Sequence, residues 1–105
     1  MGSFVRVATT SEIKPGGAKK VESGGKQIAL FNSNGTFYAI DELCTHRGGP
    51  LSEGELNGTV VTCPWHGATF DVTSGKVMGG PTVKNQGCYR VQVVGNEVQV
   101  DLNAT

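Results

Sequence analysis

Residues 26–40 read KQIALFNSNGTFYAI, and this stretch decides the fold class. An apolar run from Lys26 to Phe31 is followed by Asn32-Ser33-Asn34-Gly35 and by a second run from Thr36 to Ile40. The Asn-Gly pair supplies the positive φ angles that a tight hairpin turn needs. The stretch therefore predicts two antiparallel strands joined by a turn and half-buried against a core.

Both ends of the chain carry the same kind of pattern. Residues 4–8 have the composition of a strand, and residues 89–94 and 97–102 alternate with period two around a turn at Gly95-Asn96. Val, Ile and Thr contribute 26 of the 105 residues, Gly contributes 16, and Ala with Leu only 11. β-branched residues pack well on pleated sheets, and Gly is costly inside helices. We therefore expect an all-β protein.

The middle of the chain differs from both ends. With 105 residues the chain has the length of a single domain. Residues 41–81 are rich in Gly, Cys, His and Pro, and they offer only short strand candidates, at 59–62, 68–71 and 76–78. We expect an antiparallel β base made of residues 1–40 and 82–105, with residues 41–81 inserted as a small loop-rich lobe. Loops held on a rigid frame are where function usually lies.

The charge pattern excludes several function classes. Nine basic and nine acidic residues balance, so the chain lacks the positive surface that nucleic-acid binding requires. It also lacks an apolar run of the roughly 20 residues that a membrane span needs, and its beginning has no signal-peptide pattern. We expect a cytoplasmic protein without nucleic-acid or membrane partners. Residues 41–81 carry a net charge of −3, which is either a solvated surface or a means of orienting the lobe toward basic partner surfaces. The acidic residues of this lobe are Asp41, Glu42, Glu53, Glu55 and Asp71, against Arg47 and Lys76.

Both histidines of the chain lie close to a cysteine. The pattern is Cys44-Thr45-His46, then sixteen residues, then Cys63-Pro64-Trp65-His66. Two thiols and two imidazoles suit either zinc or an iron–sulfur cluster. Zinc sites usually pair Cys with Cys and His with His, whereas each pair here holds one of each. A third interpretation has both cysteines as small buried apolar residues. Cys88 has no neighbouring His, and we expect it to be buried without a role.

The two pairs belong to longer motifs. Residues 44–49, CTHRGG, and 63–71, CPWHGATFD, resemble the two cluster-binding loops of Rieske [2Fe–2S] proteins. Residues 37–41, 73–77 and 79–81 are also similar to that family, so the resemblance covers most of the chain. It implies a Rieske-like antiparallel β fold with one [2Fe–2S] cluster per chain. It also implies that Cys44 and Cys63 bind one iron, and that His46 and His66 bind the other and face the solvent as the electron port.

The chain departs from the respiratory branch of this family at four positions. Gly49 and Trp65 replace the two cysteines that form a disulfide between the loops, and Ala68 and Phe70 replace a Ser and a Tyr that donate hydrogen bonds to the cluster and its ligand. Losing those donors lowers the reduction potential. We expect a potential near the low end of the Rieske range, roughly −150 mV, as in the soluble ferredoxin branch.

Two further features of the loops have expected roles. Trp65 lies between two of the expected ligands, and we expect it to shield the cluster. By the same resemblance, residues 79–81, Gly-Gly-Pro, form a third loop that covers it. Gly48, Gly49 and Gly67 would let backbone N–H groups approach the cluster sulfides, although a purely turn-forming role would look the same in the sequence.

The resemblance implies an electron carrier and not an enzyme. The chain would accept single electrons from a flavoprotein reductase, itself reduced by NAD(P)H, and deliver them to a terminal oxygenase such as an aromatic-ring-hydroxylating dioxygenase. It has no His residues to spare for the mononuclear iron site of an oxygenase. We expect a monomer. Two alternatives stay open: a small accessory subunit resembling that of nitrite reductase, and a structural zinc-binding domain.

Overall fold

The computed structural model describes residues 4–43, 49–65, 67–80 and 85–102. These residues form antiparallel strands and two short 3-10 helices, η1 (Thr10–Glu12) and η2 (Leu51–Glu53), with no α-helix among them. The strands are β1 (Phe4–Thr9), β2 (Ala18–Ser23), β3 (Lys26–Ser33), β4 (Thr36–Asp41), β5 (Glu55–Asn57), β6 (Val60–Thr62), β7 (Thr69–Asp71), β8 (Val77–Gly79), β9 (Cys88–Tyr89), β10 (Val91–Val94) and β11 (Glu97–Asp101). The expected all-β class is confirmed.

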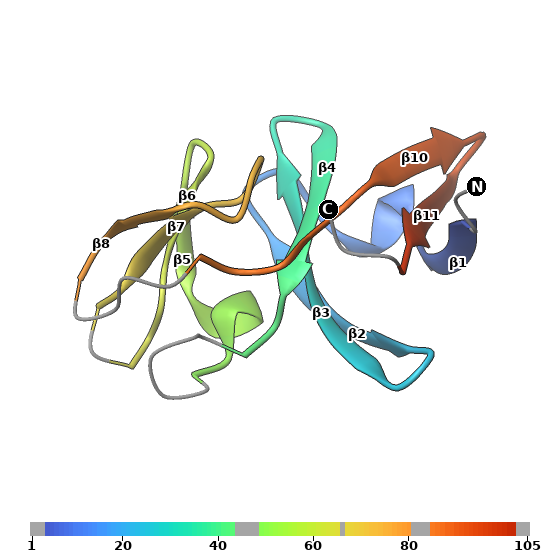
Figure 1. The fold of residues 1–105 in the computed structure, drawn as a ribbon. Helices are drawn as coiled ribbons and strands as arrows, with labels where there is room; N and C mark the ends of the chain where they lie inside the picture. Colours follow the sequence, from blue (N-terminus) through green and yellow to red (C-terminus); the bar gives the residue numbers. More distant parts are fainter. Residues whose placement is uncertain (1–3, 44–48, 66, 81–84, 103–105) are drawn as a thin grey trace.

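The strands make three sheets, with the central sheet between the other two (Figure 1). The central sheet has the order β2-β3-β4-β9, and the sheet that holds both ends of the described chain has the order β1-β11-β10. The third sheet, β5-β6-β7-β8, lies entirely within the stretch expected to form the inserted lobe. The limits of that lobe, at 41 and 81, and the single-domain organisation stay predictions.

The β3–β4 hairpin forms where the sequence predicts it. Ser33 pairs with Thr36, so only Asn34 and Gly35 make the turn, with φ angles of 53° and 92°. Positive φ at both positions is the signature of a type I′ turn. The Asn32 side chain supports it by accepting a hydrogen bond from the Gly35 N–H at 2.7 Å.

The expectation of a half-buried hairpin is wrong for β3. Every residue of this strand from Ile28 to Ser33 is buried. Ile28 and Leu30 pack into the core shared with the β1-β11-β10 sheet, whereas Ala29 and Phe31 pack into the core shared with the lobe. A strand covered on both faces needs apolar residues at successive positions, and the run Ile-Ala-Leu-Phe carries that signal.

The expected strand over residues 89–94 is divided in two at Arg90. The pair Ala39–Tyr89 joins β9 to the central sheet, whereas β10 pairs with β11 across the predicted Gly95-Asn96 turn. The alternation of the side chains continues through Arg90, so periodicity alone cannot show a strand that changes sheets. This crossing places residues 87–89 beside the end of β4, because Cys88 pairs with Ile40 and the Asp41 N–H donates to the Gly87 carbonyl.

The lobe sheet differs from the prediction in one strand. Strands β6, β7 and β8 lie at the three expected places, but β5 has no strong sequence signal, because its three residues include two polar ones between Gly54 and Gly58. Among the described residues there is no helix of the length and apolarity that crossing a membrane would require.

Candidate metal centre

One of the four expected metal ligands, Cys63, lies in the part of the chain that the structure describes. Cys44, His46 and His66 lie outside the described residues. Within the described ranges alone, no group of three or more His, Cys, Asp or Glu side chains could hold a metal ion. The complete ligand set therefore stays a prediction, and the surroundings of Cys63 are the part of the site that can be examined.

Cys63 follows β6 and is held at the start of a tight loop. Its side chain is only 2% exposed. Its backbone N–H donates to the Ala68 carbonyl at 2.7 Å, which closes the loop, and its Sγ accepts a hydrogen bond from the Trp65 N–H at 3.4 Å. Hydrogen bonds to the sulfur favour a thiolate and tune the potential of an iron–sulfur centre. The burial of the Cys63 sulfur and the N–H that donates to it therefore fit a role for Cys63 as a cluster ligand.

Gly49 brings the first expected loop against this sulfur. It is buried, and a Cβ added to it would lie 2.6 Å from the Cys63 Sγ. The same Cβ would lie 3.2 Å from the Trp65 Cβ. No side chain fits in that gap, so the backbone of one loop closes over the sulfur of the other. The expected approach of the Gly49 backbone to the cluster sulfides stays a prediction, and its close packing on the Cys63 sulfur supports it. Gly67 has open space around it and a φ of +74°, which indicates a turn role.

Apolar residues and a further glycine complete the described surroundings of Cys63. Ala68 and Phe70 are fully buried and pack in the same core as Cys63. Gly80 has a φ of +101°, and a Cβ there would lie 2.5 Å from the Ala68 Cα. The beginning of the expected third loop therefore packs directly on Ala68; its Pro81 lies outside the described residues.

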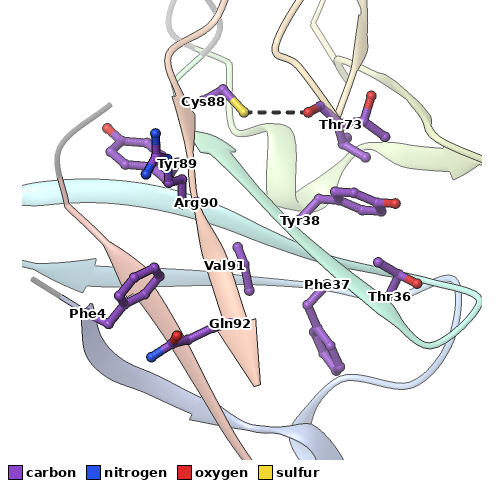
Figure 2. A pocket seen from close by; sticks show the side chains of 11 residues that line it. Phe4, Thr36, Phe37, Tyr38, Thr73, Cys88, Tyr89, Arg90, Val91 and Gln92 are labelled. Atoms are coloured by element: carbon purple, nitrogen blue, oxygen red, sulfur yellow. Dashed lines mark hydrogen bonds between the residues drawn. The ribbon is translucent and has the colours of Figure 1, made fainter. Parts of the chain in front are cut away.

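Trp65 and Cys88 differ in part from what the sequence predicts. The Trp65 side chain is 49% exposed, so a large part of the ring faces solvent, and its role as a shield stays a prediction. Cys88 is half-buried on β9 and not buried as expected, because it lines a groove between β4 and β10 (Figure 2). Its Sγ lies 3.7 Å from the Thr73 carbonyl oxygen.

The expected acidic surface before the first ligand loop is wrong for Glu42. This side chain is 1% exposed, and its carboxylate accepts hydrogen bonds from the Ser52 N–H at 2.9 Å and the Ser52 hydroxyl at 2.8 Å. The carboxylate of Asp41 is also used internally, because it accepts from the Gly87 N–H at 3.0 Å and the Tyr89 hydroxyl at 2.5 Å. Burial, reinforced by the bond to Asp41, raises the pKa of Tyr89 above its ordinary value. No local sequence pattern signals these bonds, since their partners lie 10 to 48 residues away along the chain.

Comparison with known proteins places the chain in a sequence family. Residues 3–95 match the family model for the Rieske [2Fe-2S] domain. The chain is 38% identical over 92 residues to the ferredoxin component of the naphthalene 1,2-dioxygenase system of Pseudomonas aeruginosa, and the match covers 88% of each chain.

Two solved structures share the fold over nearly the whole length. One is the ferredoxin of carbazole 1,9a-dioxygenase from Nocardioides aromaticivorans IC177, with a TM-score of 0.92, 31% identity, and coverage of 96% of this chain and 99% of that one. The other is in a complex of reduced oxygenase and oxidized ferredoxin in carbazole 1,9a-dioxygenase; its TM-score is 0.91 and its identity 33%, with coverage of 97% and 95%.

Proposed function

The chain belongs to the Rieske [2Fe–2S] domain family, and we propose that it is the ferredoxin component of an aromatic-ring-hydroxylating dioxygenase system. In this role it carries one electron at a time and is not itself the enzyme. The observation that carries the proposal is the similarity, over 88% of both chains, to a protein with this role. The donor of the electrons is an NAD(P)H-dependent flavoprotein reductase, and the acceptor is a terminal oxygenase.

The proposed cluster ligands are Cys44 and Cys63 on one iron and His46 and His66 on the other. When bound, the [2Fe–2S] cluster supplies a site that stores and releases a single electron. The surroundings of Cys63 support its part in this assignment: its sulfur is buried, accepts a backbone N–H and is overlain by Gly49.

A low reduction potential follows from residues near Cys63. Ala68 and Phe70 are fully buried and carry no hydroxyl, so neither can donate a hydrogen bond to a cluster. Gly49 and Trp65 stand where the respiratory branch has its inter-loop disulfide. The added Cβ of Gly49 would lie 3.2 Å from that of Trp65. This is shorter than the roughly 3.5–4.5 Å between the Cβ atoms of a disulfide, and a glycine with no Cβ fits this close approach of the two loops.

The proposed partner contacts are two carboxylates that lie close to the first ligand loop in the sequence. Glu53 on η2 and Glu55 on β5 are exposed and follow the first ligand loop. Transient redox complexes bury little area, under about 1,200 Å², and depend on charge for their association rate. Both partners would then present a basic rim to these carboxylates. The protein would act as a cytoplasmic monomer.

The test is to reconstitute the electron path with purified proteins. The chain should contain iron and sulfide and no zinc, show the spin-resonance signal of a reduced Rieske cluster, and be required for electron flow from a ring-hydroxylating dioxygenase reductase to its oxygenase. A colourless zinc protein would refute the proposal. So would a cluster protein that neither accepts electrons from such reductases nor reduces such oxygenases.

Charge reversal tests the contact surface separately. The Glu53→Lys/Glu55→Lys variant should slow electron transfer at low salt and leave the spectrum unchanged. The defect should shrink as salt rises, because the Debye length falls from about 30 Å at 0.01 M to about 8 Å at 0.15 M. Rates that respond neither to the substitutions nor to salt would show that these carboxylates are only solvated.

A further inference from the structure

The two ends of the first ligand loop are joined at its base. Residues 41–43 lead into the loop and residues 50–52 lead out of it, and we call these two segments the loop neck. Leu43 and Pro50 form an isolated antiparallel bridge, and the Leu51 N–H donates to the Glu42 carbonyl at 2.9 Å. The neck therefore sets where the loop that carries Cys44 and His46 begins and ends.

A buried carboxylate ties the two sides of the neck together. Both oxygens of Glu42 are used, one by the Ser52 N–H at 2.9 Å and the other by the Ser52 hydroxyl at 2.8 Å. Removing a carboxylate from water is costly unless it is hydrogen-bonded, and bonds to a charged acceptor are stronger than neutral ones. With the side chain only 1% exposed, these two bonds fix Ser52 relative to Glu42.

A buried amide ties the same neck to a distant part of the chain. Gln86 is 4% exposed, and its Nε2 donates to the Asp41 carbonyl and to the Leu43 carbonyl, each at 2.9 Å. Its backbone N–H donates to the Gly75 carbonyl at 2.7 Å. A Cβ on Gly75 would lie 2.3 Å from the Gln86 carbonyl oxygen, so the two segments are packed closely. Gln86 therefore connects the neck with the turn between β7 and β8.

We propose that Glu42, Ser52 and Gln86 form a polar clamp that positions the first ligand loop of the ferredoxin. They are positioning residues, and they act on the cluster indirectly, through the loop that they hold in place. The clamp rests on the proposed function, because the loop matters only if it carries cluster ligands. The sheets do not depend on it, since both apolar cores pack through other residues. Loss of the clamp should therefore loosen the ligand loop before it unfolds the protein.

The experiment compares clamp variants with matched surface variants in the cluster-loaded protein. Glu42→Gln and Ser52→Ala weaken the bonds across the neck, and Glu22→Gln makes the same chemical change at an exposed position of β2, outside the proposed partner surface. Gln86→Met removes the amide at nearly constant volume. Its control is Gln92→Met on β10, where the amide is exposed and donates to the Gln99 side chain at 2.7 Å, away from the neck.

Three measurements are made on each protein: the line shape of the reduced-state spin-resonance signal, the rate of cluster loss to a chelator, and the free energy of unfolding in urea. The clamp variants should broaden the signal and lose the cluster about tenfold faster. This is the order expected for a lost hydrogen bond to the charged Glu42 carboxylate, and for the two neutral hydrogen bonds that Gln86 gives up. The surface controls should match the wild type. The Glu42→Gln/Ser52→Ala double variant should lose the cluster more slowly than the two single effects combined would give, because both changes weaken the same contact between residues 42 and 52.

The outcomes separate the clamp from the proposed function. Clamp variants whose line shape equals that of the controls, with cluster loss that follows only the unfolding free energy, would overturn the clamp. If Glu42→Gln fails to fold, the milder Ser52→Ala decides by the same criterion. A wild-type protein that assembles no cluster would overturn the proposed function itself.

Discussion

Adding one methyl group at Gly49 should prevent normal cluster assembly. The added Cβ would lie 2.6 Å from the Cys63 Sγ and 3.1 Å from the Trp65 Cγ. Favourable contacts between carbon atoms lie at about 3.5–4.0 Å, so the sulfur would have to move by roughly 1 Å. Cys63 is 2% exposed and its N–H is bonded to Ala68, which leaves little room for that movement. Overpacking of this kind costs about 1–3 kcal/mol.

Gly58→Ala is the matched control for Gly49→Ala. Gly58 lies in the turn between β5 and β6 with a φ of +61°, and an added Cβ would meet nothing within 4 Å. Its cost is the left-handed backbone conformation, about 1–2 kcal/mol. Both variants thus lose a similar amount of stability, but only Gly49→Ala places an atom against a proposed ligand.

The assay is visible absorbance per mole of protein, together with iron content and the unfolding free energy in urea. Gly58→Ala should keep the wild-type absorbance and iron content despite its lower stability. Gly49→Ala should show a large loss of both. A Gly49→Ala protein with the full absorbance of the wild type would refute the inference that Gly49 closes over a ligand sulfur.

Three other predictions test the centre and its surroundings. Ala68→Ser and Phe70→Tyr should each raise the midpoint potential by tens of millivolts in a redox titration, because a new hydroxyl donor favours the reduced cluster. About 59 mV corresponds to a tenfold equilibrium shift for one electron. An unchanged potential in both variants would refute the link between the missing hydroxyls and a low potential. Cys63→Ser should abolish the visible spectrum, whereas Cys88→Ser should leave it intact, and loss of colour in the latter would show that the wrong cysteine was assigned. Because the folded-state pKa of Tyr89 is raised above its ordinary value of 10.0, its stabilising effect should be complete below about pH 10 and lost as the pH rises through the folded value; urea unfolding at alkaline pH should show this decline in the wild type and not in Tyr89→Phe.

Local patterns predict the parts of this fold that depend on local geometry. The turn at Asn34-Gly35 needs positive φ at two successive residues, and an Asn-Gly pair predicts this conformation directly. Strands β6, β7 and β8 were likewise predictable from short apolar runs between glycines. β5 was not, because a three-residue strand with two polar residues owes its pairing to its neighbour β6 and has no periodicity of its own.

The features that the sequence did not predict depend on distant partners. The division of the last hairpin at Arg90 follows from the pairing of Tyr89 with Ala39, fifty residues earlier in the chain. The burial of Glu42 follows from Ser52, and the position of Gln86 follows from two carbonyls more than forty residues away. A sequence pattern gives the residue type at each position, but it does not show the distant hydrogen-bond partner that allows a polar residue to be buried.

The internal hydrogen bonds of the acidic residues change the conclusion about which charges can attract a redox partner. The sequence assigns five acidic residues to the lobe and suggests a broad negative surface. Glu42 is buried, Asp41 bonds Gly87 and Tyr89, and Asp71 accepts two hydrogen bonds from Thr73, so these carboxylates hold the chain in place. Glu53 and Glu55 are the exposed ones. Since steering depends on charges that a partner can approach, it should rest on these two residues, and the effect of reversing them should account for most of the salt dependence of electron transfer.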